Sequence, residues 1–194
     1  SWVASETFTM PEKINLLKFR LGWADVGNGL SKRRNVDTYS FEASDWGSAK
    51  TVNISASLVD PNIKPMHSIT KEAGFDLWMM NKRVQFDFTY FIKDQVDQID
   101  QIPTVQGTGF SGMLTNIGTL TNSGVELTLR GSPVKTGNFE WESTFNYWRN
   151  TTMISDLRDE VGAYKVLGGD IAYGNFRVGS VAYEDGEYGV LMSD

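Results

Sequence analysis

The sequence predicts an all-β fold of long antiparallel strands that form part of a large transmembrane β-barrel. Apolar and polar side chains alternate over several runs, most regularly from 84 to 92. These runs approach the roughly 9–11 residues that a tilted membrane-spanning strand needs, whereas strands of soluble sandwiches more often have about 5–6. Short and long connections also alternate along the chain. That alternation is typical of an outer-membrane barrel with short periplasmic turns and long extracellular loops.

Composition narrows the class of protein further. The 194 residues include 19 glycines, 12% aromatic side chains and no cysteine, a mix that favours β structure with many turns over a helical bundle. Without cysteine, the chain has neither a disulfide framework nor a thiolate metal site. The formal net charge of −6 argues against nucleic acid as a partner, because phosphate binding needs a basic face. No run approaches the roughly 18 apolar residues of a transmembrane helix.

The first predicted strand covers residues 16–23, with Phe19 on its apolar face and Arg20 on its polar face. The alternation then stops from 24 to 65. Connections in compact domains are typically about 4–6 residues long, so this segment is predicted to be a functional loop or a hairpin excursion. A short strand is expected within 51–59.

Alternation returns in two strands that a tight turn joins. The first is predicted over 66–79 and the second over 84–92. Met80-Asn81-Lys82 forms the reversal between them, because asparagine is a favoured turn residue. The even positions of the second strand carry three aromatic residues, and its odd positions are polar except for Phe91.

The rest of the chain is predicted to alternate strands with irregular connections. The expected order is a polar loop at 93–113, a strand at about 114–130, a turn at 131–138, a strand at 139–149, an irregular segment at 150–172 and a strand pair at 176–192. A helical turn is expected within the irregular segment, at 155–161.

Alternation assigns the strand residues to two walls, since successive side chains point to opposite faces of a sheet. In lipid every backbone polar group needs an internal partner, so barrel strands must be long and fully paired. The wall expected to face lipid or the aromatic girdles contains Val84, Phe86, Phe88, Tyr90, Val125, Leu127, Leu129, Phe139, Trp141 and Phe145. The wall expected to face a polar interior contains Gln85, Asp87, Thr89, Glu126, Thr128, Arg130, Glu142 and Thr144.

Motifs that carry catalysis are weak in this sequence. Residues 107–112 match G-x-G-x-x-G, but a dinucleotide site needs this motif between a strand and a helix. A Thr/Asn-rich strand follows here, so a loop is predicted. His67 is the single histidine, which makes a poor metal site, and no G-x-S-x-G nucleophile motif accompanies it. The chain is therefore predicted not to be an enzyme and to hold no cofactor or metal.

Loop side chains provide the remaining candidate contacts. Asp94, Asp97 and Asp100 recur at every third position. Carboxylates at that spacing can hold Ca²⁺, but the twelve-residue loop pattern is missing, and solvated charge is the favoured interpretation. A basic cluster at 32–34 could bind lipopolysaccharide phosphates or an acidic substrate, although loop charges are more often merely solvated. Aromatic side chains in loop segments could stack on sugar rings, and packing within the loops is the alternative for each.

Several segments carry a resemblance to a known family, and the most specific is N-I-G-T-L-T-N-S-G-V-E-L at 116–127. The others, in matching order and spacing, are Leu16–Trp23 followed by Gly27-Asn28, Asp60–Lys64, Gly74–Leu77 leading to Asn81–Val84, Phe88–Phe91, and Phe139–Asn146. With them the chain resembles, from about residue 2 to 157, the C-terminal barrel of SusC-like (RagA-type) TonB-dependent outer-membrane transporters of Bacteroidetes.

The resemblance implies a barrel of about 22 strands that an N-terminal plug domain closes. Residues 1–194 would be a partial barrel without the plug, located in the bacterial outer membrane and in contact with its lipid. The family imports oligosaccharides or peptides with a SusD-like surface lipoprotein as a lid and with TonB acting through the plug region. Loop residues that could contact ligand or lid are then Arg33, Arg34, Trp46, Tyr164 and Tyr173.

One alternative of a different class stays open on sequence grounds. A soluble β-sandwich, such as a carbohydrate-binding module, would use the same amphipathic strands. It would pack the apolar wall of residues 84–92 against a second sheet and leave the polar wall in water.

Overall fold

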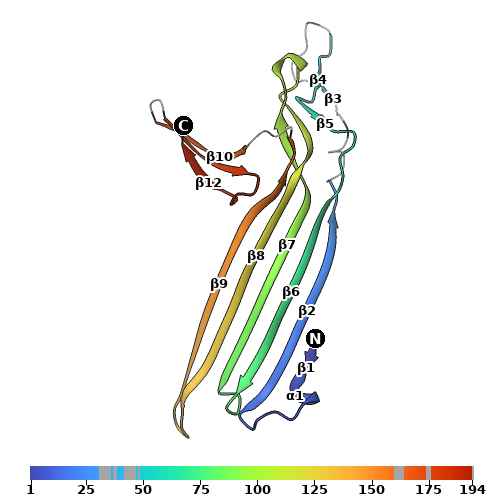
Figure 1. Cartoon of the computed structure of the whole chain (residues 1–194). Coiled ribbons are helices and arrows are strands. Elements are labelled where there is room, and N and C mark those ends of the chain that lie inside the picture. The colour runs from blue at the N-terminus through green and yellow to red at the C-terminus, as the bar shows by residue number, and fades with distance from the viewer. Residues whose placement is uncertain are drawn as a thin grey trace. The chain divides into compact units, whose positions relative to one another are not determined.

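A computed structural model describes residues 1–30, 36, 39–41, 47, 49–159, 164–173 and 176–193, which are almost entirely β structure (Figure 1). In chain order the elements are β1 (Trp2–Val3), α1 (Ala4–Thr7), β2 (Ile14–Asn28), β3 (Tyr39–Phe41), β4 (Val52–Ile54), β5 (Ser57–Val59), β6 (Met66–Met79), β7 (Val84–Pro103), η1 (Gln106–Thr108), β8 (Gly112–Lys135), β9 (Glu140–Leu157), β10 (Tyr164–Tyr173), β11 (Phe176–Tyr183) and β12 (Val190–Ser193).

Among the described residues, a seven-stranded sheet has the order β1-β2-β6-β7-β8-β5, and β9 also pairs with β8. Two smaller sheets have the orders β10-β11-β12 and β3-β4. The short strand β5 pairs with β8 in parallel, with Ser57 opposite Gly112 and Val59 opposite Leu114. The pairs β1-β2, β3-β4, β10-β11 and β11-β12 are antiparallel. The prediction of long antiparallel strands is confirmed, and the strands do not close into a barrel within this chain.

Contacts divide the chain into two compact units. Unit 1 contains Ser1–Asp25, Ile69–Asp94 and Thr121–Thr152, and unit 2 contains Val26–Ser68, Gln95–Leu120 and Met153–Asp194. Each of the five long strands therefore contributes residues to both units. No helix among the described residues is long and apolar enough to cross a membrane.

The short connections belong to unit 1. Met80, Asn81 and Lys82 all have positive φ, at 53°, 56° and 65°, which reverses the chain between β6 and β7 as predicted. The backbone N–H of Met80 donates to the carbonyl oxygen of Lys13 (2.8 Å) and that of Lys82 donates to Asn15 Oδ1 (3.0 Å). These bonds stabilise a left-handed backbone conformation, which residues other than glycine adopt only at an energetic cost. The β8–β9 connection is a tighter turn than predicted, because β8 continues to Lys135 and β9 begins at Glu140.

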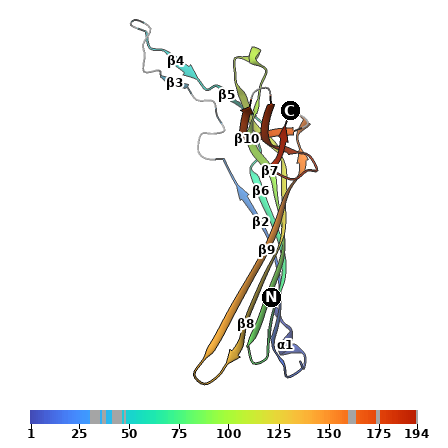
Figure 2. The ribbon, with the colours of Figure 1, turned by 90° about the vertical axis from the view of Figure 1, so that its left-hand side faces the viewer.

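A short N-terminal segment that the sequence did not predict also belongs to unit 1. Figure 2 shows β1 and α1 near the start of β2. The ring of Trp2 stacks on Phe19, with centroids 5.9 Å apart, and meets Phe8 edge-on at 5.8 Å. Aromatic contact therefore fixes this segment against the apolar side of β2.

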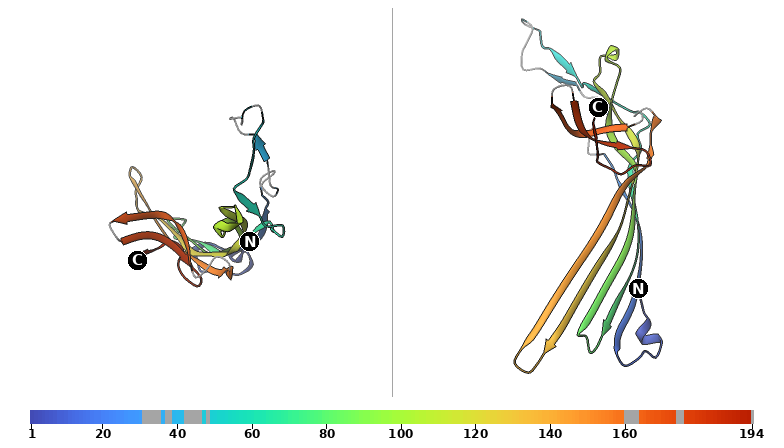
Figure 3. Two further views of the ribbon diagram at one scale, coloured as in Figure 1. Left: turned by 90° about the horizontal axis from the view of Figure 1, so that it is seen from above. Right: turned by 60° about the vertical axis from the view of Figure 1, so that its left-hand side comes forward.

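Unit 2 has its own small core. Ile154, Leu157 and Ala182 are buried together, and Leu120 and Leu167 pack against them. The sheet of β10, β11 and β12 (Figure 3) supplies Ala182 and Leu167. This sheet corrects one prediction, since it includes β10 within the stretch 150–172 that was expected to be irregular.

Two further predictions about the long strands are wrong. The loop expected from 93 is mostly strand, because β7 continues to Pro103. The sequence hides this continuation because Lys93, Asp94 and Gln95 carry no apolar side chain, so the alternation ends before the strand does. The helical turn expected at 155–161 is also wrong over its first residues, since β9 runs to Leu157 and buries Ile154 and Leu157.

Candidate functional site

An ion-pair network occupies one face of the strands in unit 1. Arg20 on β2 donates from Nη1 to Asp87 Oδ2 and from Nη2 to Asp87 Oδ1, both at 3.0 Å, and Nη2 also reaches Thr89 Oγ1 at 3.0 Å. Its Nη1 lies 2.9 Å from Asp76 Oδ1, and Lys18 Nζ lies 3.8 Å from Asp76 Oδ2. A two-point pairing of arginine with a carboxylate fixes geometry as well as charge. We call this face of unit 1 the polar wall.

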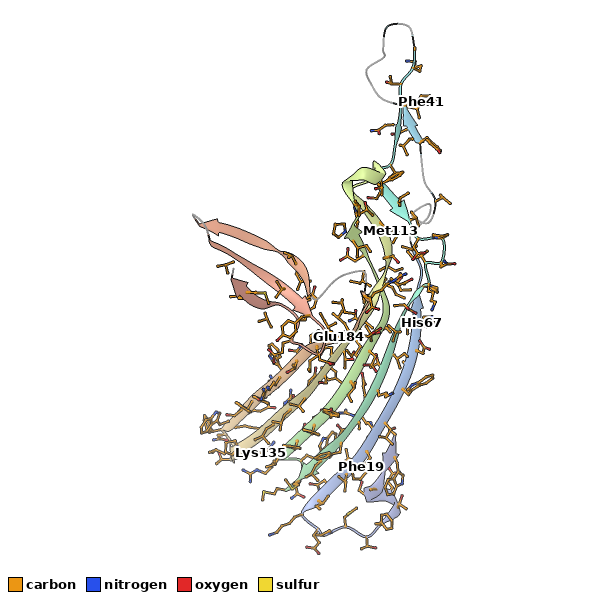
Figure 4. The ribbon with its side chains drawn as sticks, turned by 45° about the horizontal axis from the view of Figure 1, so that its top comes forward. Phe19, Phe41, His67, Met113, Lys135 and Glu184 are labelled. Carbon is orange, nitrogen blue, oxygen red and sulfur yellow. The ribbon has the colours of Figure 1, made fainter. Side chains whose placement is uncertain are left out.

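The opposite face of unit 1 is the aromatic wall. The ring centroid of Phe75 lies 6.3 Å from that of Phe19, 5.6 Å from Phe86 and 5.7 Å from Phe88. Figure 4 labels Phe19 on β2. Further along this wall, Trp141 and Phe145 on β9 are more than half exposed, at 54% and 59%. The predicted separation of the two walls is therefore confirmed for residues 86–89, and it places a large apolar surface on the outside of unit 1.

The polar wall is hollowed above a stretch of small residues. A hollow of about 530 Å³ is lined by residues from β2, β6, β7 and β8, among them Arg20, Glu72, Asp87, Phe91 and Glu126. Glycines allow close approach beside it: a methyl group at Gly74 would lie 2.5 Å from the carbonyl oxygen of Phe88, and one at Gly124 would lie 2.7 Å from Cζ of Phe91. Side chains larger than hydrogen are therefore excluded at both positions.

Trp148 is the feature of the polar wall that the sequence interpretation missed. Thr128 Oγ1 donates to Asn146 Oδ1 (3.0 Å), and Arg130 Nε lies 3.4 Å from Glu142 Oε1, so even-numbered residues of β9 lie on the polar wall. Trp148 follows by alternation, and it is 72% exposed. The sequence signal that could have placed Trp148 on the polar wall is its even-numbered position, which it shares with the polar residues Glu142, Thr144 and Asn146.

Unit 2 contains a second polar cluster, which we call the Asp60 clasp and define as Asp60, Thr115 and Arg158. Asp60 Oδ2 accepts hydrogen bonds from Thr115 Oγ1 (2.6 Å) and Arg158 Nη1 (3.2 Å). Thr115 is fully buried, and Asp60 is 8% exposed. Asp60 Oδ1 also accepts from the backbone N–H of Asn62 at 2.8 Å. The clasp therefore ties the loop after β5 to β8 and to the end of β9.

A neighbouring side chain extends this anchoring. Asn116 Nδ2 donates to the carbonyl oxygens of Lys64 (3.0 Å) and Asp97 (2.8 Å), and Asn116 Oδ1 accepts from the backbone N–H of Lys64 (2.8 Å). One amide side chain thus satisfies backbone groups on two segments that are distant in sequence. Asn116 therefore provides hydrogen-bond partners for backbone groups of the loop that would otherwise need others.

The clasp predicts an acid-sensitive loop. The hydrogen bond from Thr115, then that from the Asn62 backbone, and the Arg158 guanidinium hold the pKa of Asp60 below its ordinary value. A lowered pKa in the folded state means that ionised Asp60 stabilises the fold above its ordinary pKa of about 4, and that this stabilisation is lost as pH falls through the lower folded value. Below pH 4, backbone amides 62–64 should therefore lose protection against hydrogen exchange.

The Asp60→Asn variant provides the matched comparison. It should weaken the loop by about 1–2 kcal/mol at pH 7 and should remove the additional loss of protection below pH 4. Protection of the β10–β12 sheet serves as the internal reference. Unchanged acid sensitivity in Asp60→Asn would show that another group causes it.

The structure separates the predicted loop candidates. Arg33, Arg34 and Trp46 lie outside the described residues. Tyr164 and Tyr173 were predicted in loop segments, but they are the first and last residues of β10, opposite Tyr183 and Phe176. The loop prediction for them is therefore wrong, because pairing with β11 orders this segment.

The structure also places the single histidine, the glycine-rich segment and the aspartates that the sequence analysis considered. His67 lies in β6 near Gly27. The segment 107–112 contains part of the 3-10 turn η1 and then enters β8, which confirms the loop interpretation of its glycines. Asp94 accepts from Thr121 Oγ1 (2.8 Å), and Asp100 Oδ1 accepts from the backbone N–H of Gln101 (2.7 Å). Within the described part of the chain, no group of three or more His, Asp or Glu residues is placed to hold a metal ion.

Long strands with one polar and one aromatic wall are typical of a segment of a transmembrane β-barrel wall. Residues 11–190 match the family described as TonB dependent receptor-like, beta-barrel. The chain belongs to this family, whose members are outer-membrane proteins. That membership decides against the soluble-sandwich alternative.

Individual proteins agree with the family assignment. The chain is 27% identical over 178 residues to TonB-dependent receptor P39 of Formosa agariphila, a match that covers 90% of this chain and 15% of that protein. It is 26% identical over 173 residues to TonB-dependent receptor SusC of Bacteroides thetaiotaomicron, with coverages of 82% and 17%. A chain in the solved structure of the RagAB peptide transporter has the same fold, with a TM-score of 0.76 at 16% identity over 91% of this chain and 18% of that chain. The chain thus spans less than a fifth of each of these proteins.

Proposed function

We propose that this chain forms part of the wall of an outer-membrane nutrient importer of the SusC/RagA type, which takes up oligosaccharides or peptides. The observation that supports it best is the pairing of an exposed aromatic wall with a charged polar wall in unit 1. A lipid-facing outside and a water-filled inside require this arrangement. On this proposal residues 1–194 are a partial barrel, and the plug belongs to the rest of the polypeptide.

The proposed mechanism needs no catalytic residue in this chain. Import is driven by the inner-membrane proton gradient through TonB, which acts on the plug after ligand binds. The barrel wall holds the plug and provides the path, while a SusD-like lipoprotein covers the extracellular loops as a lid. Arg33, Arg34, Trp46, Tyr164 and Tyr173 are the residues we propose for contact with the ligand or the lid.

A transport assay on the full-length protein tests this function. The protein should fractionate with the outer membrane, and deleting its gene should abolish uptake of a fluorescent oligosaccharide or peptide from a panel of both. Deleting TonB, or collapsing the proton gradient, should have the same effect. A protein that stays monodisperse without detergent and fractionates away from the membrane would contradict the proposal.

A further inference from the structure

A groove runs along β6 on the aromatic wall of unit 1. Two adjoining hollows, of about 500 and 450 Å³, are both lined by Leu21 on β2, Ala73 on β6 and Tyr90 on β7. We call the two hollows together the Ala73 groove. Strand β6 is paired on both sides, with β2 and with β7, so the depression at Ala73 is not the open edge of a sheet. It exists because Ala73 is a small side chain with larger ones on the two neighbouring strands.

The two ends of the groove differ in chemistry. At one end it is lined by the rings of Phe75 and Phe88, whose centroids are 5.7 Å apart. At the other end it is lined by Lys71, which is exposed. Alternation along β6 places Lys71 on the same wall as Phe75. The groove is therefore apolar at one end and cationic at the other.

Lys71 is an unusual residue for an aromatic wall. A charge on a surface that faces hydrocarbon is costly unless the side chain reaches the membrane interface or a partner of opposite charge. Among the described residues, no carboxylate forms an ion pair with Lys71. The adjacent Glu72 also lines this end, but by alternation its side chain belongs to the polar wall, where it lines the hollow beside Arg20. A partner for Lys71 therefore has to come from outside the described chain.

The length of the groove matches one leaflet of a bilayer. Lys71 and Phe75 are four residues apart, which is about 14 Å along a strand, and one leaflet of the hydrocarbon core is roughly 15 Å deep. Strand β6 begins at Met66, after the long connection, and ends at Met79, before the short turn. Long connections of outer-membrane barrels are extracellular, so Lys71 lies toward the headgroups of the extracellular leaflet and Phe75 toward the middle of the membrane.

We propose that the Ala73 groove binds lipid A, the membrane anchor of lipopolysaccharide, with one acyl chain over Ala73 and one phosphate against Lys71. Lipid A is the phosphorylated lipid of the extracellular leaflet, and its phosphates carry the charge opposite to that of lysine. An acyl chain gains dispersion contacts from a groove with a small floor and apolar sides. The proposal rests on the proposed function, since it requires the aromatic wall to face lipid and the long connections to be extracellular.

Binding of lipid A to the full-length protein in detergent tests the cationic end. Native mass spectrometry measures the fraction of protein that carries one lipid as purified lipid A is added. Lys71→Gln should raise the half-saturating concentration about 5-fold, the effect of one lysine at a lipid headgroup, and Lys71→Arg should restore binding. The matched control is Lys135→Gln, at the end of β8 (Figure 4), which should leave the concentration unchanged.

A second pair of variants tests the acyl-chain end. Ala73→Trp fills the floor of the groove and should raise the half-saturating concentration about 3-fold or more, because the ring takes the place of the chain. Leu77→Trp places the same ring on the same strand and wall, but Leu77 lines neither hollow. This control should leave binding unchanged.

Other results would overturn the proposal. Equal binding of lipid A and its fully dephosphorylated form would show that the groove does not recognise phosphate. Equal weakening by Ala73→Trp and Leu77→Trp would show that lipid covers the whole wall without preference for the groove. Phosphatidylglycerol that binds as well as lipid A, with the same dependence on Lys71, would assign the groove to phospholipid. Each of these results removes this inference alone, whereas loss of outer-membrane location or of TonB-dependent uptake would remove the proposed function.

Discussion

Replacing Phe88 with arginine is expected to destabilise the full-length protein in phospholipid vesicles. On the proposed function Phe88 faces lipid, where an arginine costs up to about 2–4 kcal/mol at the bilayer midplane and less near the interfaces. The ring of Phe88 packs 5.7 Å from that of Phe75 on the aromatic wall. On that proposal a charge at this position would face hydrocarbon with no partner, whereas the native ring is compatible with hydrocarbon. The urea dependence of unfolding in vesicles measures the difference.

Thr144→Arg is the matched control for Phe88→Arg. Thr144 is exposed and lies on the polar wall of β9, between Glu142 and Asn146. The same charge introduced there points away from lipid and should change stability by no more than about 0.5 kcal/mol. Phe88→Leu separates loss of packing from the cost of the charge. Equal destabilisation by the two arginines would contradict the assignment of the walls.

Gly118→Ala is expected to cost about 2–4 kcal/mol in the stability of unit 2. Gly118 has a φ of 147°, and a methyl group there would overlap the carbonyl oxygen of Asp156 and lie 3.1 Å from Cα of Leu157. This is where β8 meets the end of β9, since the backbone N–H of Arg158 donates to the carbonyl oxygen of Ile117 at 2.9 Å. Separating these segments would also disturb the Asp60 clasp.

Hydrogen exchange at residues 154–158 measures this effect, because it reports local opening of β9 without requiring reversible unfolding of the whole protein. Gly107→Ala is the control, since nothing lies within 4 Å of the position where its methyl group would be. Protection in Gly118→Ala equal to that of the unmodified chain would show that β8 can move away from Asp156 without loss.

Much of the framework could be predicted from local pattern. The strand predicted over 66–79 is β6, the reversal at residues 80–82 is present, and the strand over 84–92 is the first part of β7. These predictions succeed because a side-chain period of two has a direct counterpart in a pleated strand with one apolar wall. The predicted separation of the two walls is also confirmed for residues 86–89, since Phe86 and Phe88 contact Phe75 whereas Asp87 and Thr89 contact Arg20.

Prediction from local pattern fails where the apolar and polar side chains no longer alternate with a period of two. Lys93, Asp94 and Gln95 carry no apolar side chain, so the continuous strand β7 has the composition of a polar loop in this stretch. The end of β9 was missed because Ile154 and Leu157 gain their burial from Ala182, on a strand that is distant in sequence. Among the site candidates, Tyr164 and Tyr173 were placed in loops because β10 has little alternation of its own and is defined by its pairing with β11.

By itself the sequence determined that the strands are antiparallel and amphipathic, and which family its motifs resemble. These follow from the order of apolar and polar side chains, which any pleated chain must express. Only the tertiary structure decided which charges meet. Arg20 pairs with Asp87 across β6, and Asp60 accepts hydrogen bonds from Thr115 and Arg158. Each of these contacts depends on the register between strands, and register is a property of paired chains rather than of one segment.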